Sequence, residues 1–339
     1  MAPSGATLVG SFKDINGKVT GVKFFDVRAS AKSLRFSFEL PKAVNNPSLD
    51  HHFELPSFKN LSTFAARAFT WLGALAIVFL TQLILISQVH YASAQFKATE
   101  TLRYELANGT APVGQVDSNG ALIAAGTPVA FLMIEKLGLQ EVVLEGTSSN
   151  ITTDGPGHRR DTVLPGQAGI SVIFGRQASY GGVFANISKL EVGDKITTVT
   201  GQGEASYTVS RIRVAGDEAT NALGNSKGRL TLVTTSGTPF LPSGVVRVEA
   251  TLDGEPKVTP VRVIQNGAIP ASEKALGGYM DALTPLIYLS QFLILLLVAI
   301  FWLARRWGKV QAWLAGTPVL ILVGSIWSGL VIQLLPNLL

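Results

Sequence analysis

The sequence predicts a mainly β protein in which one β-barrel domain is joined to three transmembrane α-helices. Three apolar runs without a single charge predict the helices: residues 68–89, 282–304 and 310–339. Each run is longer than the roughly 20 residues that cross a bilayer as a helix. Between the first two runs, short β-rich segments alternate with Gly, Pro, Asn and Asp. That spacing is typical of an antiparallel barrel or sandwich and not of alternating helices and strands.

The expected organisation has eight parts. In chain order they are a cytoplasmic segment (1–65), a transmembrane helix (66–90), a juxtamembrane stalk (91–127), the barrel domain (128–253), a return linker (254–281), a second transmembrane helix (282–304), a cytoplasmic turn (305–310) and a third transmembrane helix (311–335).

The charge distribution predicts the orientation of these parts. Residues 1–67 carry nine Lys or Arg against five Asp or Glu, and the turn adds Arg305, Arg306 and Lys309. Basic residues near membrane ends favour the cytoplasmic side. We therefore expect the N-terminal segment and the turn inside the cell and the barrel outside. The basic residues form no clustered stripe, so no nucleic-acid partner is expected.

The N-terminal segment offers two interpretations. Asn16-Gly17 is a hairpin signal, and apolar residues alternate through 19–27, as in a strand. A basic arm on anionic lipid and a strand docked onto a partner protein both fit this composition. His51 and His52 are adjacent, which is poor spacing for a shared metal, so we expect neither a metal site nor a cofactor.

The barrel domain contains six runs with strand character, separated by turn residues. They are 129–134, 170–174, 195–200, 205–213, 229–235 and 245–252. The following segment, 254–281, holds three prolines and four glycines, which indicates a connecting loop.

A series of short motifs runs through the barrel domain in a fixed order. They are Val129-Ala130 with Ile134, Lys136-Leu137-Gly138-Leu139, Val143 to Thr147, Gly155-Pro156-Gly157-His158, Leu164-Pro165-Gly166, Tyr180-Gly181 with Phe184, Asn186 and Leu190, Gly193-Asp194, and Leu230-Thr231-Leu232-Val233-Thr234. In this order the domain resembles the sortase family, in particular the class E sortases of actinobacteria. The resemblance implies a sortase-like β-barrel outside the plasma membrane of a bacterial cell.

The resemblance also implies where an active site would lie. Sortases use a cysteine thiolate, a histidine and an arginine to transfer a peptide acyl group. Arg176 stands where the family has its histidine, and Thr235 stands where it has its cysteine. Arg247 lies two residues beyond the start of the last strand, where the family arginine is found, so its match is open.

These replacements predict a degenerate sortase that is not an enzyme. The chain has no cysteine and therefore no thiolate. A guanidinium does not shuttle protons, and a threonine hydroxyl is a poor nucleophile without an adjacent base. The candidate binding residues are Arg176, His158, Tyr180, Thr235, Ser236 and Arg247.

We expect such a domain to serve as a binding or scaffold subunit of a membrane complex in the cell envelope. Its partners would be membrane proteins, reached through the transmembrane helices and the cytoplasmic segment, and a peptide could lie in the barrel groove. Two alternatives remain open. One is an active transpeptidase or peptidase with Thr235 or Ser236 as its nucleophile, and the other is an accessory protein that binds glycan or lipid.

Overall fold

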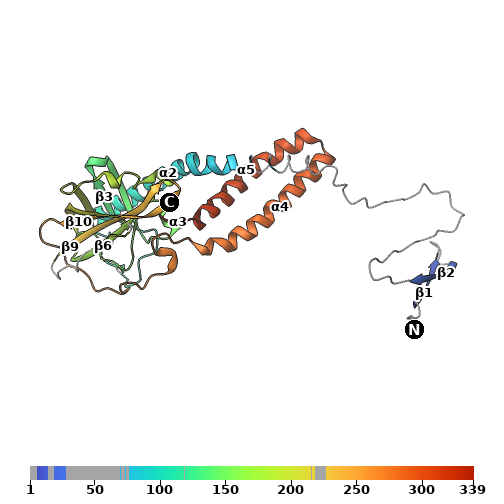
Figure 1. Ribbon diagram of the computed structural model, residues 1–339, viewed down its shortest axis with the longest axis horizontal. Coiled ribbons are helices and arrows are strands. Elements are labelled where there is room, and N and C mark those ends of the chain that lie inside the picture. Colours follow the sequence, from blue (N-terminus) through green and yellow to red (C-terminus); the bar gives the residue numbers. More distant parts are fainter. Residues whose placement is uncertain are drawn as a thin grey trace. The chain divides into compact units, whose positions relative to one another are not determined.

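The computed structural model describes residues 6–13, 19–27, 69, 73, 76–117, 119–214, 216–217 and 227–339. They belong to two compact units, Met1–Ser62 and Thr63–Leu339. In the first unit, β1 (Ala6–Lys13) and β2 (Val19–Val27) pair as an antiparallel hairpin (Figure 1). The hairpin expected from Asn16-Gly17 is therefore present, although residues 14–18, His51 and His52 lie outside the described residues.

The second unit contains a closed β-barrel of eight strands in the order β10-β8-β7-β3-β4-β5-β6-β9. Most neighbouring strands are antiparallel, whereas the β4–β5 and β6–β9 pairs are parallel. The strands are β3 (Pro128–Ile134), β4 (Leu139–Glu145), β5 (Gly157–His158), β6 (Gly169–Phe174), β7 (Lys195–Thr200), β8 (Gly203–Arg213), β9 (Gly228–Thr238) and β10 (Leu241–Leu252). The prediction of a mainly β barrel is confirmed.

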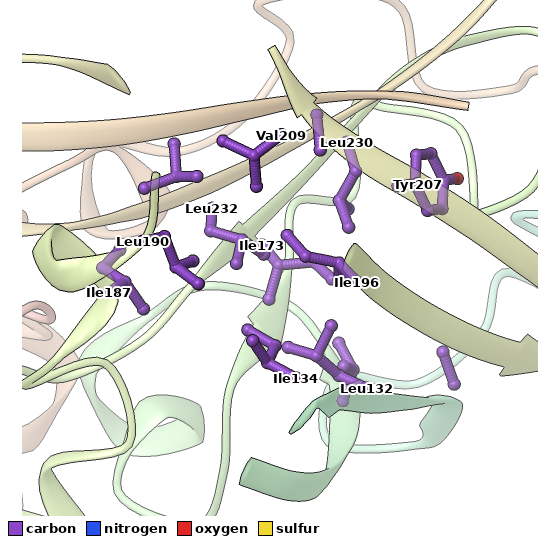
Figure 2. Close-up of a cluster of buried hydrophobic side chains, with 14 of the residues drawn as sticks. Leu132, Ile134, Ile173, Ile187, Leu190, Ile196, Tyr207, Val209, Leu230 and Leu232 are labelled. Carbon is purple, nitrogen blue, oxygen red and sulfur yellow. The ribbon is translucent and has the colours of Figure 1, made fainter. Parts of the chain in front are cut away.

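All six predicted strand runs lie within strands of this barrel, and β4 and β5 complete it. The β5 strand has only two residues, too few to show any alternation. The hydrophobic core fills the barrel interior with side chains from the strands and from their connections, such as Ile187 and Leu190 (Figure 2). On β9, for example, Leu230 and Leu232 are fully buried in the core. Because side chains alternate between the two faces of a strand, Thr231 and Val233 lie on the outer face.

Three helices in this unit are long and apolar enough to cross a membrane, spanning Ala76–Asn108, Met280–Arg306 and Lys309–Leu334. The first includes η2 (Gln82–Ile86) and α2 (Ser87–Asn108), and the others are built on α4 (Leu283–Arg306) and α5 (Lys309–Leu334). The prediction of three membrane-spanning helices agrees with these lengths and compositions.

The short helical turns of the barrel unit lie mainly in its connections. They are η3 (Glu135–Leu137), α3 (Ser149–Thr152), η4 (Tyr180–Gly182), η5 (Ile187–Lys189), η6 (Ala271–Glu273) and η7 (Met280–Ala282).

The α2 helix packs along the barrel, although the sequence indicates a stalk there. Ala98 and Leu102 are buried against Val142 and Leu144 of β4. The Gln95 side chain also bonds to the β4 backbone: its Oε1 accepts from the Val142 N–H at 2.8 Å and its Nε2 donates to the Val142 carbonyl at 3.1 Å. These contacts attach the first membrane helix directly to the domain.

The α4–α5 hairpin brings the chain back to the barrel (Figure 1). The two helices pack closely at Gly316, where an added Cβ would lie 2.7 Å from Ile300. Elsewhere along the two helices, the Trp327 Nε1–H of α5 donates to the Ser290 hydroxyl of α4 at 2.8 Å. Beyond α5, Leu338 packs against β6, β9 and β10, whereas Leu335 packs against Leu83, Tyr91 and Tyr180.

Candidate functional site

The candidate site lies on the outer face of three neighbouring strands. Phe174 of β6 is paired with Val233 of β9, which is paired with Arg247 of β10. One step along β9, Thr235 is paired with Val245. The side chains of these rows share one face because residues two apart along a strand point the same way. We call this face the groove; its floor is formed by Val172, Phe174, Thr231, Val233 and Val245.

Thr235 is 1% exposed, at one end of the groove. Its Oγ1–H donates to the Gln177 side-chain oxygen at 2.7 Å and contacts the Leu338 carbonyl oxygen at 3.4 Å. Among the described residues, the Thr235 hydroxyl has no hydrogen bond to a carboxylate or an imidazole. The hydroxyl therefore faces a peptide carbonyl, with a neutral amide as its nearest proton acceptor.

Arg176 follows β6 and is completely buried. Its Nη2 donates to the Ser149 carbonyl at 2.9 Å and to the Ser149 hydroxyl at 2.8 Å. Its Nη1 donates to the Ser179 hydroxyl at 3.1 Å and to the Leu339 carbonyl at 3.0 Å. Burial lowers the pKa of Arg176 to about 10. The side chain is thus a buried cation held by the main-chain oxygens of Ser149 and Leu339 and by two serine hydroxyls.

The position of Arg176 depends on close packing between the preceding residue, Gly175, and the Phe184 ring. A Cβ on Gly175 would lie 2.4 Å from the Phe184 ring, so the chain needs glycine at this point. Tyr180, with its ring centroid 5.4 Å from the Arg176 guanidinium carbon, closes the other side of the cation. The Tyr180 ring meets His90 edge-on at 5.6 Å, and His90 Nε2 lies 2.8 Å from an Asp154 carboxylate oxygen.

Residues 336–339 form a turn at this end of the groove, in which the Leu339 N–H donates to the Pro336 carbonyl at 3.2 Å. The Leu338 side chain is fully buried in what we call the Leu338 pocket, formed by Val172, Phe174, Val233, Val245 and Ala275. The Leu338 carbonyl accepts from the Gln177 backbone N–H at 3.0 Å. The Asn337 amide donates to the Thr147 carbonyl at 2.6 Å and to the Lys274 carbonyl at 3.0 Å. The groove therefore holds a short turn through the Leu338 carbonyl, the Asn337 side-chain amide and one apolar side chain.

A cavity of about 530 Å³ continues from the Leu338 pocket along the same strands. Val172, Phe174, Val233 and Ala275 line both spaces. The charged lining residues of the cavity are Arg159, Arg213, Arg229, Arg247, Lys274 and Glu249. We call this space the cationic cavity.

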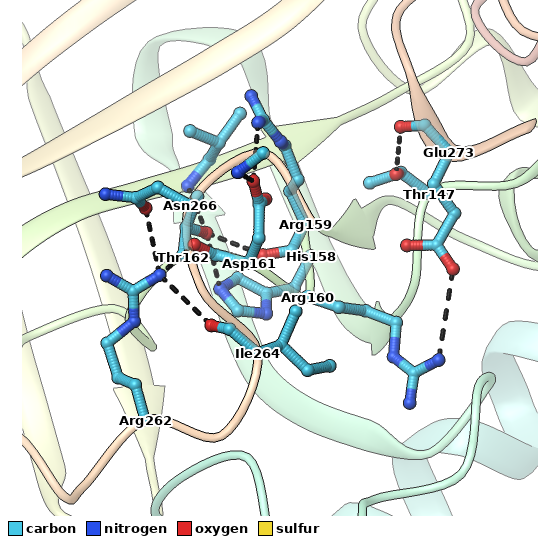
Figure 3. A network of polar contacts seen from close by, with 12 residues as sticks. Thr147, His158, Arg159, Arg160, Asp161, Thr162, Arg262, Ile264, Asn266 and Glu273 are labelled. Atoms are coloured by element: carbon cyan, nitrogen blue, oxygen red, sulfur yellow. Dashed lines mark hydrogen bonds and ion pairs between the residues drawn. The ribbon is translucent and has the colours of Figure 1, made fainter. Parts of the chain in front are cut away.

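His158 belongs to a separate buried network (Figure 3). Its Nδ1 lies 2.8 Å from Glu145 Oε2, and its Nε2 lies 2.9 Å from the Val163 carbonyl. Burial alone would lower the pKa of His158, but the Glu145 carboxylate outweighs burial and leaves the pKa above its ordinary value. Both ring nitrogens are engaged, so this histidine holds its own loop in place.

The same network fastens the return segment, 254–281, to the barrel. The Gly267 N–H donates to Asp161 Oδ2 at 2.7 Å, and the Arg262 guanidinium donates to the Asp161 carbonyl (Figure 3). The Thr147 hydroxyl donates to the Glu273 carbonyl at 2.7 Å. Because Gly267, Lys274 and Ala275 line the cationic cavity, these bonds fix one wall of it.

The structure thus brings together Arg176, Tyr180 and Thr235 around residues 337–339. Arg247 is paired with Val233 and not with Thr235, so it lies one row away and lines the cationic cavity. Ser236 lies beside Ser243, with the two hydroxyl oxygens 3.4 Å apart.

The sequence did not indicate Gln177, Ser149, Ser179 or Leu338 as site residues. These residues reach the site only through the tertiary fold, and no local sequence pattern marks them. Leu338, for example, contacts Thr235 across more than a hundred positions of the chain.

Comparison with known proteins shows what the domain is similar to. Residues 132–242 match the sortase domain family. Sortase D of Bacillus subtilis (strain 168) is 25% identical over 115 residues, which make up 34% of this chain and 57% of the relative. The chain therefore spans a little over half the length of this relative.

Two solved structures are also similar. The sortase D5 transpeptidase of Clostridium perfringens is 26% identical, with 48% of this chain and 99% of that chain covered and a TM-score of 0.41. Sortase E1 from Streptomyces coelicolor, solved with a tripeptide in its active site, is 25% identical, with 39% and 91% covered and a TM-score of 0.35.

These matches correct one expectation. The absence of the cysteine and the histidine predicts that the chain is not an enzyme, but the matching family model and the matching relative are both sortases. The prediction that this chain is not an enzyme is therefore wrong. A missing thiolate excludes one nucleophile, whereas the Thr235 hydroxyl still faces a peptide carbonyl.

Proposed function

We propose that this sortase-type domain binds a short peptide in its groove while the membrane helices hold it at the outer surface of a bacterial membrane. The peptide would place an apolar side chain in the Leu338 pocket and its backbone carbonyls against Gln177, Arg176 and Thr235. Residues 335–339 would be the resident occupant, which an external peptide replaces.

The observation that carries this proposal is the way Leu338 is held. Its side chain fills an apolar pocket, and its carbonyl accepts from the Gln177 N–H at 3.0 Å. Main-chain hydrogen bonds supply affinity and a pocket for a side chain supplies specificity when a domain recognises a short peptide. Neither contact depends on Leu338 belonging to the same chain, so a peptide of similar pattern can make both.

The membrane helices support a scaffold role for the protein. The α4–α5 hairpin adds two apolar helices to the one that precedes the barrel, and their exposed apolar faces suit helix packing with other membrane proteins. We infer a topology with the N-terminal hairpin and the α4–α5 turn in the cytoplasm, based on Arg305, Arg306 and Lys309 near that turn.

Acyl transfer through Thr235 is the second candidate, favoured by the family and by the 3.4 Å contact between its Oγ1 and the Leu338 carbonyl oxygen. In such a step the hydroxyl oxygen would bond to a peptide carbonyl carbon, and the C–N bond would break. The hydroxyl proton would pass to the departing amine. A second amine would then take the acyl group from the ester and regenerate the hydroxyl.

Peptide binding is tested with the full chain in mild detergent and a fluorescent peptide that copies residues 335–339, Leu-Pro-Asn-Leu-Leu. We expect saturable binding that Val245→Asp abolishes, because it places a carboxylate in the Leu338 pocket. The matched control is Val192→Asp, at a side chain that is 71% exposed. Binding that survives Val245→Asp would rule out this groove.

Acyl transfer is tested by mass spectrometry on the same mixtures with an added amine. We expect a peptide–amine product and a transient ester on the protein, both lost in Thr235→Val. This variant keeps the side-chain shape without the hydroxyl. A product that persists in Thr235→Val would exclude this nucleophile, whereas peptide binding without any product would leave binding as the function.

A further inference from the structure

We propose that the cationic cavity selects peptides that carry acidic side chains next to the apolar residue held in the Leu338 pocket. This inference rests on the proposed peptide binding and adds the chemical class of the ligand.

The charge of the cavity is strongly one-sided. Five cationic side chains and one carboxylate line it: Arg159, Arg213, Arg229, Arg247, Lys274 and Glu249. Glu249 is almost fully buried and already holds Arg213, with an oxygen 2.6 Å from Nη2. Arg159 pairs with Asp161 at 2.7 Å. Both carboxylates are thus engaged, and the cavity keeps an excess of positive charge.

Arg247 and Lys274 are the cations best placed to receive a ligand. In the part of the chain that the structure describes, neither side chain has a carboxylate within ion-pair distance. Burial lowers the pKa of Arg247, and the nearby guanidinium of Arg213 lowers it further. A carboxylate entering the cavity would relieve this repulsion and form charge-assisted hydrogen bonds, which are among the stronger polar contacts in proteins.

The floor of the cavity indicates that the ligand is a peptide. The cavity shares Val172, Phe174, Val233 and Ala275 with the Leu338 pocket, so the two spaces form one continuous groove. A chain whose apolar side chain fills the pocket therefore directs neighbouring side chains into the cavity. Strands β6 and β9 form the floor of this groove and the return segment forms its wall.

The experiment compares two short fluorescent peptides with full-length protein in detergent. Each has one central Leu, flanked on both sides either by Glu or by Gln. We expect the Glu peptide to bind about tenfold more tightly at low salt, with a smaller difference at high salt because ions screen exposed charges. Replacing Arg247 and Lys274 together by Gln should bring the two affinities together. Arg103→Gln, at an exposed cation on α2, is the matched control and should preserve the preference.

Each outcome bears on one of the two proposals. Equal Leu-dependent binding of both peptides would overturn the acidic preference and leave peptide binding intact. Binding of neither peptide would overturn the proposed function itself. Glycerol phosphate serves as a separate anion probe. If it displaced the Glu peptide as effectively as unlabelled Glu peptide does, the cavity would be selecting phosphate, and the proposal of acidic peptides would fail.

Discussion

The guanidinium of Arg176 donates a hydrogen bond of 3.0 Å to the carbonyl oxygen of Leu339, a residue 163 positions later in the chain. The Ser179 hydroxyl donates to the same carbonyl at 2.5 Å. Leu339 lies just beyond α5, so this contact links the membrane hairpin to the end of the groove. Release of Leu339 from the groove would remove this attachment of α5 to the barrel.

Replacing Arg176 by Met should lower the free energy of unfolding of the barrel by about 3 kcal/mol, because the carbonyls of Ser149 and Leu339 lose their buried donors. Denaturant unfolding of the full chain in detergent, followed by circular dichroism, measures the change. Arg103→Met, at an exposed side chain, should change it by less than about 0.5 kcal/mol. Equal effects of the two variants would show that the buried hydrogen bonds of Arg176 do not stabilise the barrel.

Replacing Leu338 by Gly should release residues 337–339 from the groove. The loss of a buried leucine side chain costs about 2–4 kcal/mol. The fraction of protein with a free groove then rises, and the apparent Kd for an external peptide falls by a similar factor, on the order of 30-fold or more. Fluorescence anisotropy with the Leu-Pro-Asn-Leu-Leu peptide measures this. Val192→Gly should leave the Kd unchanged; an unchanged Kd in Leu338→Gly would mean that residues 337–339 do not compete with the peptide.

His158 should make the stability of the barrel depend on pH. Its pKa in the folded protein lies above the ordinary value of 6.5, chiefly because the Glu145 carboxylate outweighs the effect of burial. Its protonation therefore stabilises the fold fully below about pH 6.5, and this stabilisation is lost as the pH rises through the folded-state pKa.

The comparison with His158→Gln isolates this contribution. We expect the stability difference between wild type and variant to be larger at about pH 5.5 than at about pH 9. Thermal unfolding at the two pH values measures it. A difference that is independent of pH would show that His158 does not change its protonation in this range.

Gly316→Val should weaken the packing between α4 and α5. The added side chain would meet Ile300, since even a Cβ at this position lies 2.7 Å from it. Overpacking of this kind costs about 1–3 kcal/mol. Gly324→Val is the matched control, because nothing lies within 4 Å of its added Cβ. The temperature at which the solubilised chain unfolds should fall for the first variant only, and equal falls would contradict close packing at Gly316.

Local sequence patterns predicted most of the architecture. The three membrane-spanning helices follow from charge-free runs, because the bilayer requirement depends on composition and length alone. Alternation predicted six barrel strands, including the run that carries Thr235. The two-residue β5 strand shows no such period and is formed only because β4 and β6 lie on either side of it.

The order of the sequence motifs singled out Arg176 and Thr235, but no motif indicated their surroundings. Ser149, Ser179 and Leu339 accept hydrogen bonds from Arg176, which is completely buried. Arg247 was a candidate for the catalytic position, but the β9–β10 register pairs it with Val233.

By itself, the sequence determined that this chain combines a β-barrel with three apolar helices. Burial of a strand face depends on local periodicity, and membrane insertion depends on local composition and length. Only the tertiary structure decided that residues 337–339 return to the groove and that the arginines of three different strands converge on one cavity. Such contacts join residues far apart in the chain, and their formation depends on strand register and on the path of α5, neither of which a local pattern encodes.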